Sequence, residues 1–173
     1  MCSGFQVTSK NLAQGFAHVC IVGCLSVAPA LGVSGGGKDF ATKDLKGDTT
    51  FAGSTFRGKD FTQVDAKGVD FRKADLSGSR FYRAKLEGAK FDFANLQGAS
   101  LEDSDLLDAS FEGTNLSGAY ISAGFEQVKT LKSADFTDVL MPEKTKRVLC
   151  ARNDAAGTNP TTNTETRDSL MCE

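Results

Sequence analysis

The chain has 173 residues, a formal net charge of −2 and a sequence pI of about 5.5. It has room for one domain, and its bulk charge enforces neither non-specific nucleic-acid binding nor a polyanionic surface. It contains 13 Phe and 18 Gly but no Trp, which indicates a core with one repeated slot that accepts one side-chain shape.

The first distinct segment is an uncharged, mostly apolar run over positions 11–33, preceded by Lys10. It has the length of a signal-peptide core and contains the small-residue sequence A-P-A at 28–30, which predicts a cleaved export signal over residues 1–30. Two alternatives remain open. The run is nearly long enough to stay as a membrane anchor, although Pro29 and nearby glycines interrupt it. The sequence I-V-G-C at 21–24 resembles a bacterial lipobox, which would place a lipid on Cys24. We favour cleavage, and expect no stable membrane insertion of the mature chain.

From residue 51 onward, a large apolar residue occupies almost every fifth position. The position two before it is usually small and often alanine, the position just before it is often Asp or Asn, and Gly is frequent two positions after it. The series comprises Phe51, Phe56, Phe61, Phe71, Leu76, Phe81, Leu86, Phe91, Leu96, Leu101, Leu106, Phe111, Leu116 and Ile121, and resumes in phase at Leu131, Phe136 and Met141.

A period of five fits neither regular element. On an α-helix each step of five turns the residue by about 140°, so the large residues would spread around the whole cylinder. On a straight strand an odd period sends alternate large residues to opposite faces. The pattern buries one face only if the chain turns a corner inside every repeat, with Gly supplying the turn and Asp or Asn bonding nearby backbone amides. The sequence therefore predicts an all-β solenoid.

The number of repeats in one coil follows from which residues would stack above one another, in a column, at a given spacing. With a spacing of twenty residues, Phe51, Phe71, Phe91 and Phe111 form one column of identical rings, and Leu76, Leu96 and Leu116 belong to a second. With a spacing of fifteen residues, large and small side chains would fall in the same column. Four repeats in each coil are therefore predicted, with the large side chains filling the interior.

The sequence A-N-L-Q-G at 94–98, with its sister runs at 74–78 and 114–118, resembles the A-(D/N)-L-x-x motif of the pentapeptide-repeat family. The resemblance covers about residues 38–141. It implies a right-handed quadrilateral β-helix, and we place the β-helix at 31–141, between the export signal and a C-terminal cap and tail at 142–173.

Two places break the pattern. Phe40 and Leu45 lie one residue out of phase, which predicts a one-residue bulge within 47–50. Glu126 falls in a large inward slot, where an unpaired carboxylate would be costly. We therefore expect the stretch 123–130 to leave the coil as a loop that turns Phe125 or Val128 inward.

After residue 141 the period ends. Pro142 and Glu143 are typical of a first helical turn, and 144–152 is predicted as a short helix that covers the last coil with Val148 and Leu149 as its apolar side. The polar tail beyond it would stray unless tied down. A disulfide between Cys150 and Cys172 would tie it, and two free thiols are the alternative.

The runs at 134–139, 147–150 and 166–172 resemble the end of plant and algal thylakoid-lumen pentapeptide-repeat proteins. Those proteins share a C-terminal helical cap and paired cysteines. The resemblance implies a chloroplast thylakoid-lumen location, and the A-P-A site then resembles a lumenal-transfer signal, although the stretch before it is short for a full two-part transit peptide. A bacterial periplasmic or lipid-anchored location is the alternative.

Nothing in the repeat region resembles a catalytic site. The only His, His18, lies in the N-terminal segment, and two distant cysteines give no metal-ligand set. We therefore expect no enzyme activity, no metal and no cofactor. Outward-facing aromatic residues are the better anchors for an unknown protein partner, namely Tyr82, Phe93 and Tyr120.

Two classes of function follow. The favoured one is a non-catalytic structural or protein-interaction module of the lumen. The alternative follows from family members that mimic DNA and protect type II topoisomerases. DNA mimicry needs a strongly acidic face, whereas this repeat region mixes basic and acidic residues in near-equal number. An exported bacterial lipoprotein solenoid is a further alternative. Nucleic-acid binding is not favoured, and the oligomeric state is not predicted.

Overall fold

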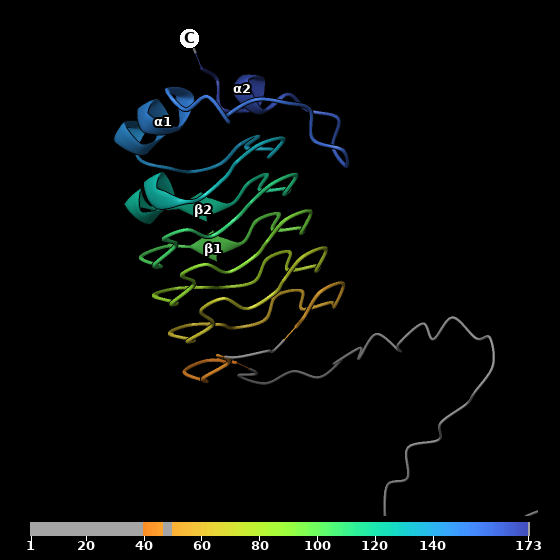
Figure 1. Cartoon of the computed structure of the whole chain (residues 1–173), viewed down its shortest axis with the longest axis vertical. Helices are drawn as coiled ribbons and strands as arrows, with labels where there is room; N and C mark the ends of the chain where they lie inside the picture. The colour runs from red at the N-terminus through yellow and green to blue at the C-terminus, as the bar shows by residue number, and fades with distance from the viewer. Residues whose placement is uncertain (1–39, 47–49, 173) are drawn as a thin grey trace, which may run out of the picture.

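The computed structural model describes residues 40–46 and 50–172. The expected export signal and most of the expected bulge lie outside the described residues. The chain winds into a stack of coils joined side by side through parallel backbone pairing (Figure 1). Within these described residues, only β1 (Ser100–Leu101) and β2 (Tyr120–Ile121) are long enough to count as strands, and they pair in parallel.

Neighbouring coils are held in register by single bridges between residues twenty positions apart, such as Thr55 with Asp75 and Asn95 with Asn115. The amides of most inward-facing large residues donate to the coil above, as Phe71 N does to Lys90 O at 2.8 Å. The predicted spacing of twenty residues agrees with this pairing, and repeated parallel pairing along one axis defines a β-helical solenoid.

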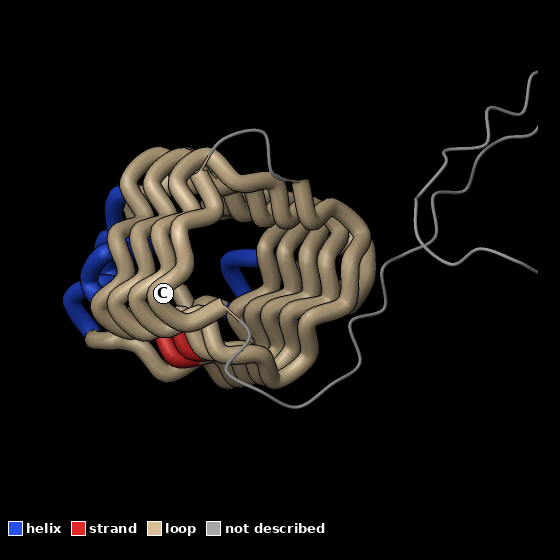
Figure 2. Tube along the Cα trace, turned by 90° about the horizontal axis from the view of Figure 1, so that it is seen from below, coloured by secondary structure: helices blue, strands red, loops and turns tan. Residues whose placement is uncertain are grey.

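The interior is filled by stacked side chains. The rings of Phe71 and Phe91 lie parallel with centroids 5.1 Å apart, and Phe91 and Phe111 repeat that distance. A second stack contains Phe61 and Phe81 at 4.6 Å, and it meets the first stack edge to face. The space enclosed by the tube in Figure 2 is therefore occupied by buried rings and leucines rather than by solvent.

The first described stretch confirms the phase shift. Phe40 N and Leu45 N donate to carbonyls twenty positions ahead, at Asp60 and Asp65, whereas Phe51 N donates to Asp70, nineteen positions ahead. The chain between these two stretches therefore contains one residue more than the five-residue repeat requires. Residues 47–49, where we expect the bulge, are outside the described part of the chain.

The second break is also as predicted. A 3₁₀ helix, η1 (Ala123–Gln127), replaces one side of a coil and turns Phe125 into the core, with Val128 buried after it. The carboxylate of Glu126 points outward and accepts a hydrogen bond from the Thr145 hydroxyl at 3.1 Å. The loop therefore exchanges an unsuitable Glu for a Phe inside the stack.

Two short helices lie at one end of the stack, α1 (Glu143–Cys150) and α2 (Thr166–Ser169) (Figure 1). α1 was predicted with Val148 and Leu149 as its apolar side. The prediction is correct for Leu149, but Thr145 is buried beside it and Val148 is only half-buried. Thr145 and Leu149 are one helical turn apart, so they share the face that packs on the solenoid. α2 was not predicted.

The tail is held by buried residues and hydrogen bonds that were not predicted, in addition to the expected disulfide. Ala155, Asn159, Thr166 and Leu170 are all buried. Tail atoms also accept the amides that the last coil would otherwise offer to a next coil. Leu131 N donates to Asp154 Oδ2, Ser133 N to Ala156 O and Phe136 N to Ser169 Oγ, all at 2.9–3.0 Å. The tail thus supplies hydrogen-bond acceptors for backbone amides at the open edge of the last coil.

Candidate functional site

The packed interior leaves no room for a substrate, so candidate sites lie on the outer surface. Within residues 40–46 and 50–172, no group of three or more His, Cys, Asp or Glu side chains is arranged to hold a metal ion. The same part of the chain contains no helix that is long and apolar enough to cross a membrane.

The three predicted anchor residues lie on two sides of the solenoid. Phe93 follows Tyr82 by about half a coil, so their side chains leave the molecule in opposite directions. Tyr120 lies two coils above Tyr82 on nearly the same side, and it pairs with Leu140, which is also exposed. One flat partner surface cannot contact all three residues at once.

Phe93 is the only aromatic side chain among the described non-glycine residues that have a positive φ. Its side chain is 47% exposed, and its backbone has a φ of 60°. This left-handed region costs an L-residue about 1–2 kcal/mol, and the other corners that adopt it carry either Gly or a residue such as Gln63 or Asp103. The ring lies over Gly113, where an added Cβ would stand only 2.6 Å from Phe93 Cδ1. Gly113 therefore makes room for the ring.

A hollow of about 560 Å³ opens on the other side of the Phe93 ring, lined also by Ala52, Gly53, Arg72 and Lys73. The Arg72 guanidinium is bound to both oxygens of Asp70, at 2.9 and 2.6 Å, and this contact lowers the pKa of the Asp70 carboxyl. Lys73 makes no ion pair within the described residues. The hollow thus combines an aromatic wall with one cation that is open to a partner.

Tyr82 lies between two arginines, with the guanidinium carbons of Arg80 and Arg83 at 5.5 and 5.3 Å from its ring centroid. Arg83 also faces Asp103 on the next coil at 4.0 Å. The basic residues of this coil are distributed around its circumference, and acidic residues follow one coil later. These exposed pairs are compatible with a solvated surface and by themselves indicate no ligand.

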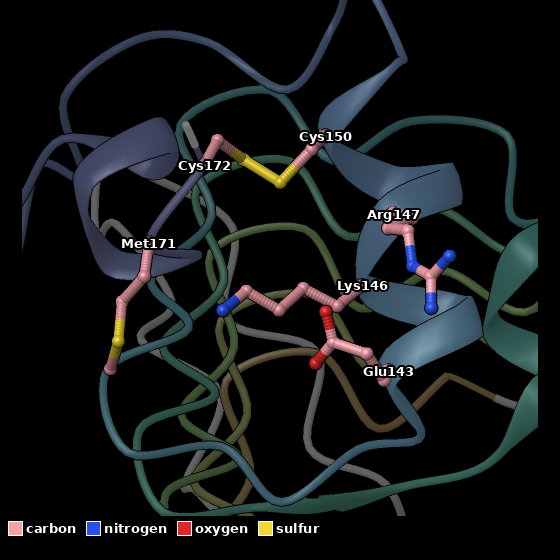
Figure 3. Close-up of a pocket in the computed structure, with 6 residues that line it drawn as sticks. All are labelled: Glu143, Lys146, Arg147, Cys150, Met171 and Cys172. Atoms are coloured by element: carbon pink, nitrogen blue, oxygen red, sulfur yellow. A yellow bond between two sulfur atoms is a disulfide. The ribbon is translucent and has the colours of Figure 1, made fainter.

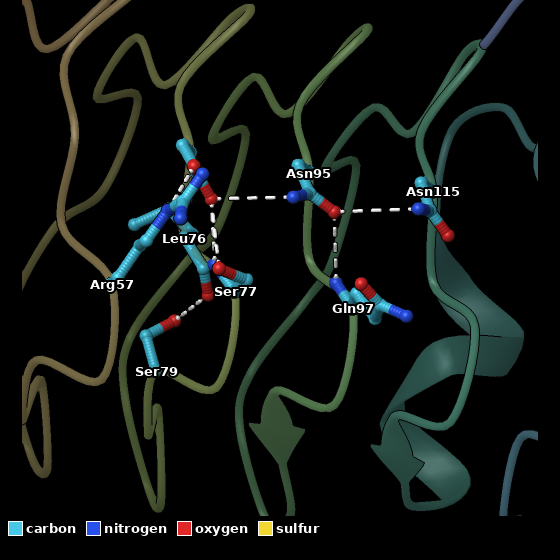
Figure 4. Close-up of polar contacts among 8 residues, drawn as sticks. Arg57, Leu76, Ser77, Ser79, Asn95, Gln97 and Asn115 are labelled. Atoms are coloured by element: carbon cyan, nitrogen blue, oxygen red, sulfur yellow. Dashed lines mark hydrogen bonds and ion pairs between the residues drawn. The ribbon is translucent and has the colours of Figure 1, made fainter.

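The Asp and Asn residues that precede the inward leucines form a ladder along one side of the solenoid (Figure 4). Asn115 Nδ2 donates to Asn95 Oδ1 at 3.3 Å, and Asn95 Nδ2 donates to Asp75 Oδ1 at 3.2 Å. Each side chain also accepts from the amide two residues ahead, as predicted from the repeat. The links between coils were not predicted, although the twenty-residue spacing of these residues was a signal for them.

A second hollow, of about 420 Å³, lies between α1 and the end of the tail (Figure 3). Glu143, Lys146 and Arg147 line it from α1, and Met171 lines it from the tail. Cys150 and Cys172 also line it, and the structure joins them by a disulfide with a Cα–Cα distance of 5.6 Å. The tail therefore has a covalent link in addition to its hydrogen bonds.

Asn159 is a residue that the sequence reasoning missed. It is buried, and its Nδ2 group donates to the carbonyls of Gly113, Thr114 and Ser133 at 3.0–3.2 Å. Its Oδ1 accepts from the amides of Thr161 and Thr162. Sequence offered no signal, because nothing in the repeat says which tail residue will meet the solenoid.

Several aspartates have a lowered pKa in the folded chain, and we therefore expect the chain to lose stability in acid. Hydrogen bonds from Arg152, and then from the Leu131 amide, outweigh burial and lower the pKa of Asp154. For Asp135, burial raises the pKa but hydrogen bonds led by those from Thr137 outweigh it, so the net pKa is lowered. Because the folded-state pKa values lie below the unfolded value of about 3.9, the stabilisation is complete above that pH and is lost as pH falls below it.

We therefore expect the urea midpoint to be flat between about pH 5 and 7 and to fall steeply below about pH 4. The Asp154→Asn variant should lose part of this slope, by at most about one proton, or ~1.4 kcal/mol per pH unit. Urea unfolding of both proteins at a series of pH values measures it. An unchanged slope in the variant would show that Asp154 is not a source of the acid sensitivity.

The chain was compared with known families and structures. A family model for pentapeptide repeats, with 8 copies, matches residues 47–83 and 84–122. A crystal structure of a pentapeptide-repeat protein from the thylakoid lumen of Arabidopsis thaliana matches with 31% identity and a TM-score of 0.70, over 77% of this chain and 90% of that one. No curated protein matches the chain significantly.

Two further solved structures show weaker similarity. HetL, a pentapeptide-repeat protein from the cyanobacterium Nostoc involved in regulating heterocyst differentiation, is 28% identical, with a TM-score of 0.41 over 55% of this chain and 41% of that one. QnrB1, a plasmid-mediated fluoroquinolone resistance protein, is 21% identical, with a TM-score of 0.41 over 57% of this chain and 53% of that one. On the repeat, the stacked coils and the Arabidopsis match, the chain belongs to the pentapeptide-repeat family and folds as a right-handed β-helical solenoid.

Proposed function

We propose that this chain is a non-catalytic protein-interaction module of the thylakoid lumen. The lumenal location is supported by the similarity to the Arabidopsis lumen protein and by the export signal expected over residues 1–30. N-terminal sequencing of the protein from isolated chloroplasts tests it: a mature chain that begins near residue 31 in the lumen fraction supports the location. Recovery in the stroma, or with a lipid on Cys24, would contradict it.

The proposal extends to the architecture. We infer a quadrilateral cross-section, since each coil contains four five-residue sides, with the β-helix at 31–141 and a C-terminal cap at 142–173. α1 and the tail would serve as the cap, because they contact the last coil and accept its free amides. A solenoid buries its end coils only against such a cap.

One observation carries the interaction role: the strained and half-exposed Phe93. A residue at this corner needs a positive φ, and Gly would meet that need without strain. Folding alone therefore gives little reason for a large aromatic side chain here. A partner that places an apolar group against the ring and a carboxylate near Lys73 would give that reason.

A substitution by glycine separates binding from folding. We expect Phe93→Gly to leave the unfolding free energy within about 1 kcal/mol of the original, because relief of backbone strain offsets the lost ring contact with Gly113. Recovery of a specific lumenal partner by the variant should fall at least about tenfold, as expected for a contact worth ~1.4 kcal/mol or more.

Gln63→Gly is the matched control, because Gln63 also has a positive φ but lies on another side of the solenoid. It should recover the same partner as the original chain. Equal recovery by both variants, in quantitative pull-down from lumen extract, would remove Phe93 from the interaction surface. Urea unfolding of both variants verifies that the fold is intact.

A further inference from the structure

We propose that the Cys150–Cys172 disulfide is a thiol-exchange site, at which a dithiol reductant opens the bond while the solenoid stays folded. This proposal is independent of the lumenal interaction role. It rests on the placement of the disulfide in an accessible hollow, on the charges around it, and on the way the rest of the tail is attached.

The disulfide can be reached without unfolding. Both cysteines are only half-buried, and both line the hollow of about 420 Å³ between α1 and the end of the tail. Met171, which forms part of the opposite wall, is 65% exposed. Figure 3 shows the sulfur–sulfur bond bridging the two walls, with the Lys146 side chain extending into the space beside it. The phenylalanine stack, in contrast, is closed to solvent.

The charges favour the thiolate that must leave when the bond opens. Lys146 and Arg147 are four and three residues before Cys150, so they lie about one helical turn from it on α1. Arg167 approaches from α2 and donates to Cys150 O at 3.2 Å. Glu143 and the C-terminal end of α1 act in the opposite sense. Among the described charged residues that line the hollow or contact Cys150, three are cations and one is a carboxylate, and this net positive charge favours a thiolate over a thiol.

The exchange is a two-electron reduction by a dithiol. One thiolate of the reductant attacks the Cys172 sulfur, the Cys150–Cys172 bond breaks, and Cys150 leaves as a thiolate with the bonding pair. The second thiolate of the reductant then attacks the reductant's first sulfur, which is bonded to Cys172 in the mixed disulfide. This step releases Cys172 as a thiolate. The reductant ends as a disulfide, and both cysteines take up protons from water according to pH.

Opening the bond affects only part of the tail. The stretch around residues 154–159 is held to the last two coils by Asp154, Ala156 and Asn159, without help from the disulfide. The first residue of α2, Thr166, is tied to this stretch, because its amide and hydroxyl donate to Gly157 O at 3.0 and 2.9 Å. The later part of α2 is attached through the Ser169 hydroxyl, which accepts from Phe136 N, and through buried Leu170 near Cys172. Reduction should therefore loosen the Ser169–Leu170 end of α2 and expose the Phe136 amide, while Thr166 and the Asn159 anchor stay in place.

Reduction kinetics test the electrostatic part. The oxidised full chain is mixed with dithiothreitol at pH 7, quenched by alkylation and mapped by peptide mass, which separates Cys150 and Cys172 from the three N-terminal cysteines. We expect the native protein to be reduced, and the Lys146→Gln/Arg147→Gln double variant to react about threefold to tenfold more slowly. Lys144→Gln, also on α1 but outside the hollow, is the control and should react at the original rate.

A rate that is unchanged in the double variant would overturn the electrostatic argument. A native reduction rate that equals the rate of global unfolding would overturn the site itself, since the bond would then open only in unfolded molecules.

Hydrogen exchange tests the structural part on the reduced wild-type chain, so that no variant needs to fold. The amides of Phe136 and Leu170 should exchange at least about tenfold faster than in the oxidised chain, whereas those of Leu131 and Ser133 should change little. Uniform acceleration across the whole tail, or none at all, would contradict a local release of α2.

Discussion

Replacing Phe91 by alanine is expected to lower the unfolding free energy by about 3–5 kcal/mol, a large part of the stability of a single domain. Phe91 is fully buried, and its ring is stacked between Phe71 and Phe111 at 5.1 Å on each side. Truncation removes a ring from the middle of the column. The neighbouring rings cannot close the gap, because backbone pairing fixes the separation of the coils.

Phe93→Ala is the matched control, because it deletes the same side chain two residues away on the outside. Its ring is about half exposed, so its loss should cost less than about 1 kcal/mol. Urea unfolding of the two variants measures the difference. Similar losses for both would show that the interior column does not dominate stability, and the prediction of a filled solenoid core would lose its main energetic consequence.

The repeat region was predictable from sequence because one local rule acts many times. A large residue in every fifth position and columns twenty residues apart are enough to place Phe71 over Phe91 and to reject helices and flat sheets. The same rule located the two irregularities of the repeat. Phe40 is out of phase with the later residues, and Glu126 falls in an inward position that Phe125 fills instead.

The C-terminal tail was less predictable because no rule repeats there. α1 could be identified from Pro142 and the residues after it, but its buried face depended on which turn met the solenoid. α2 has only four helical residues, too few to show a period. The role of the tail also depends on contacts far apart in sequence, such as Asn159 with Gly113, and sequence patterns do not encode these.

The outer surface shows a similar limit. Of the three residues proposed as anchors, Phe93 and Tyr120 are exposed and Tyr82 is half-buried, and how they lie relative to one another depends on counting positions around a coil. Once the coil of twenty residues is known, Tyr82 and Phe93 must lie on opposite sides. The strain at Phe93 and the space above Gly113 become visible only with backbone angles and atomic positions.

Asn159→Ala is expected to destabilise the chain by about 2–4 kcal/mol. The amide group of Asn159 serves three carbonyls on two coils, and its oxygen holds the turn that follows. Alanine removes the Asn159 donor from the carbonyls of Gly113 and Ser133, whereas Thr114 O keeps its hydrogen bond from Asp135 N. Asn153, which is exposed, provides the control, and Asn153→Ala should cost less than about 0.5 kcal/mol.

The same change should also loosen the end of the solenoid. If Asn159 holds the tail on the last coil, its loss should accelerate hydrogen exchange at Ser133 N, which donates to Ala156 O, while Phe91 N in the middle of the stack stays protected. This pattern is the reverse of the one expected on reduction, where Phe136 exchanges and Ser133 does not. The two experiments therefore separate the two attachments of the tail, one through hydrogen bonds at Asn159 and one through the disulfide, and equal protection of Ser133 in the variant and the original chain would refute the first.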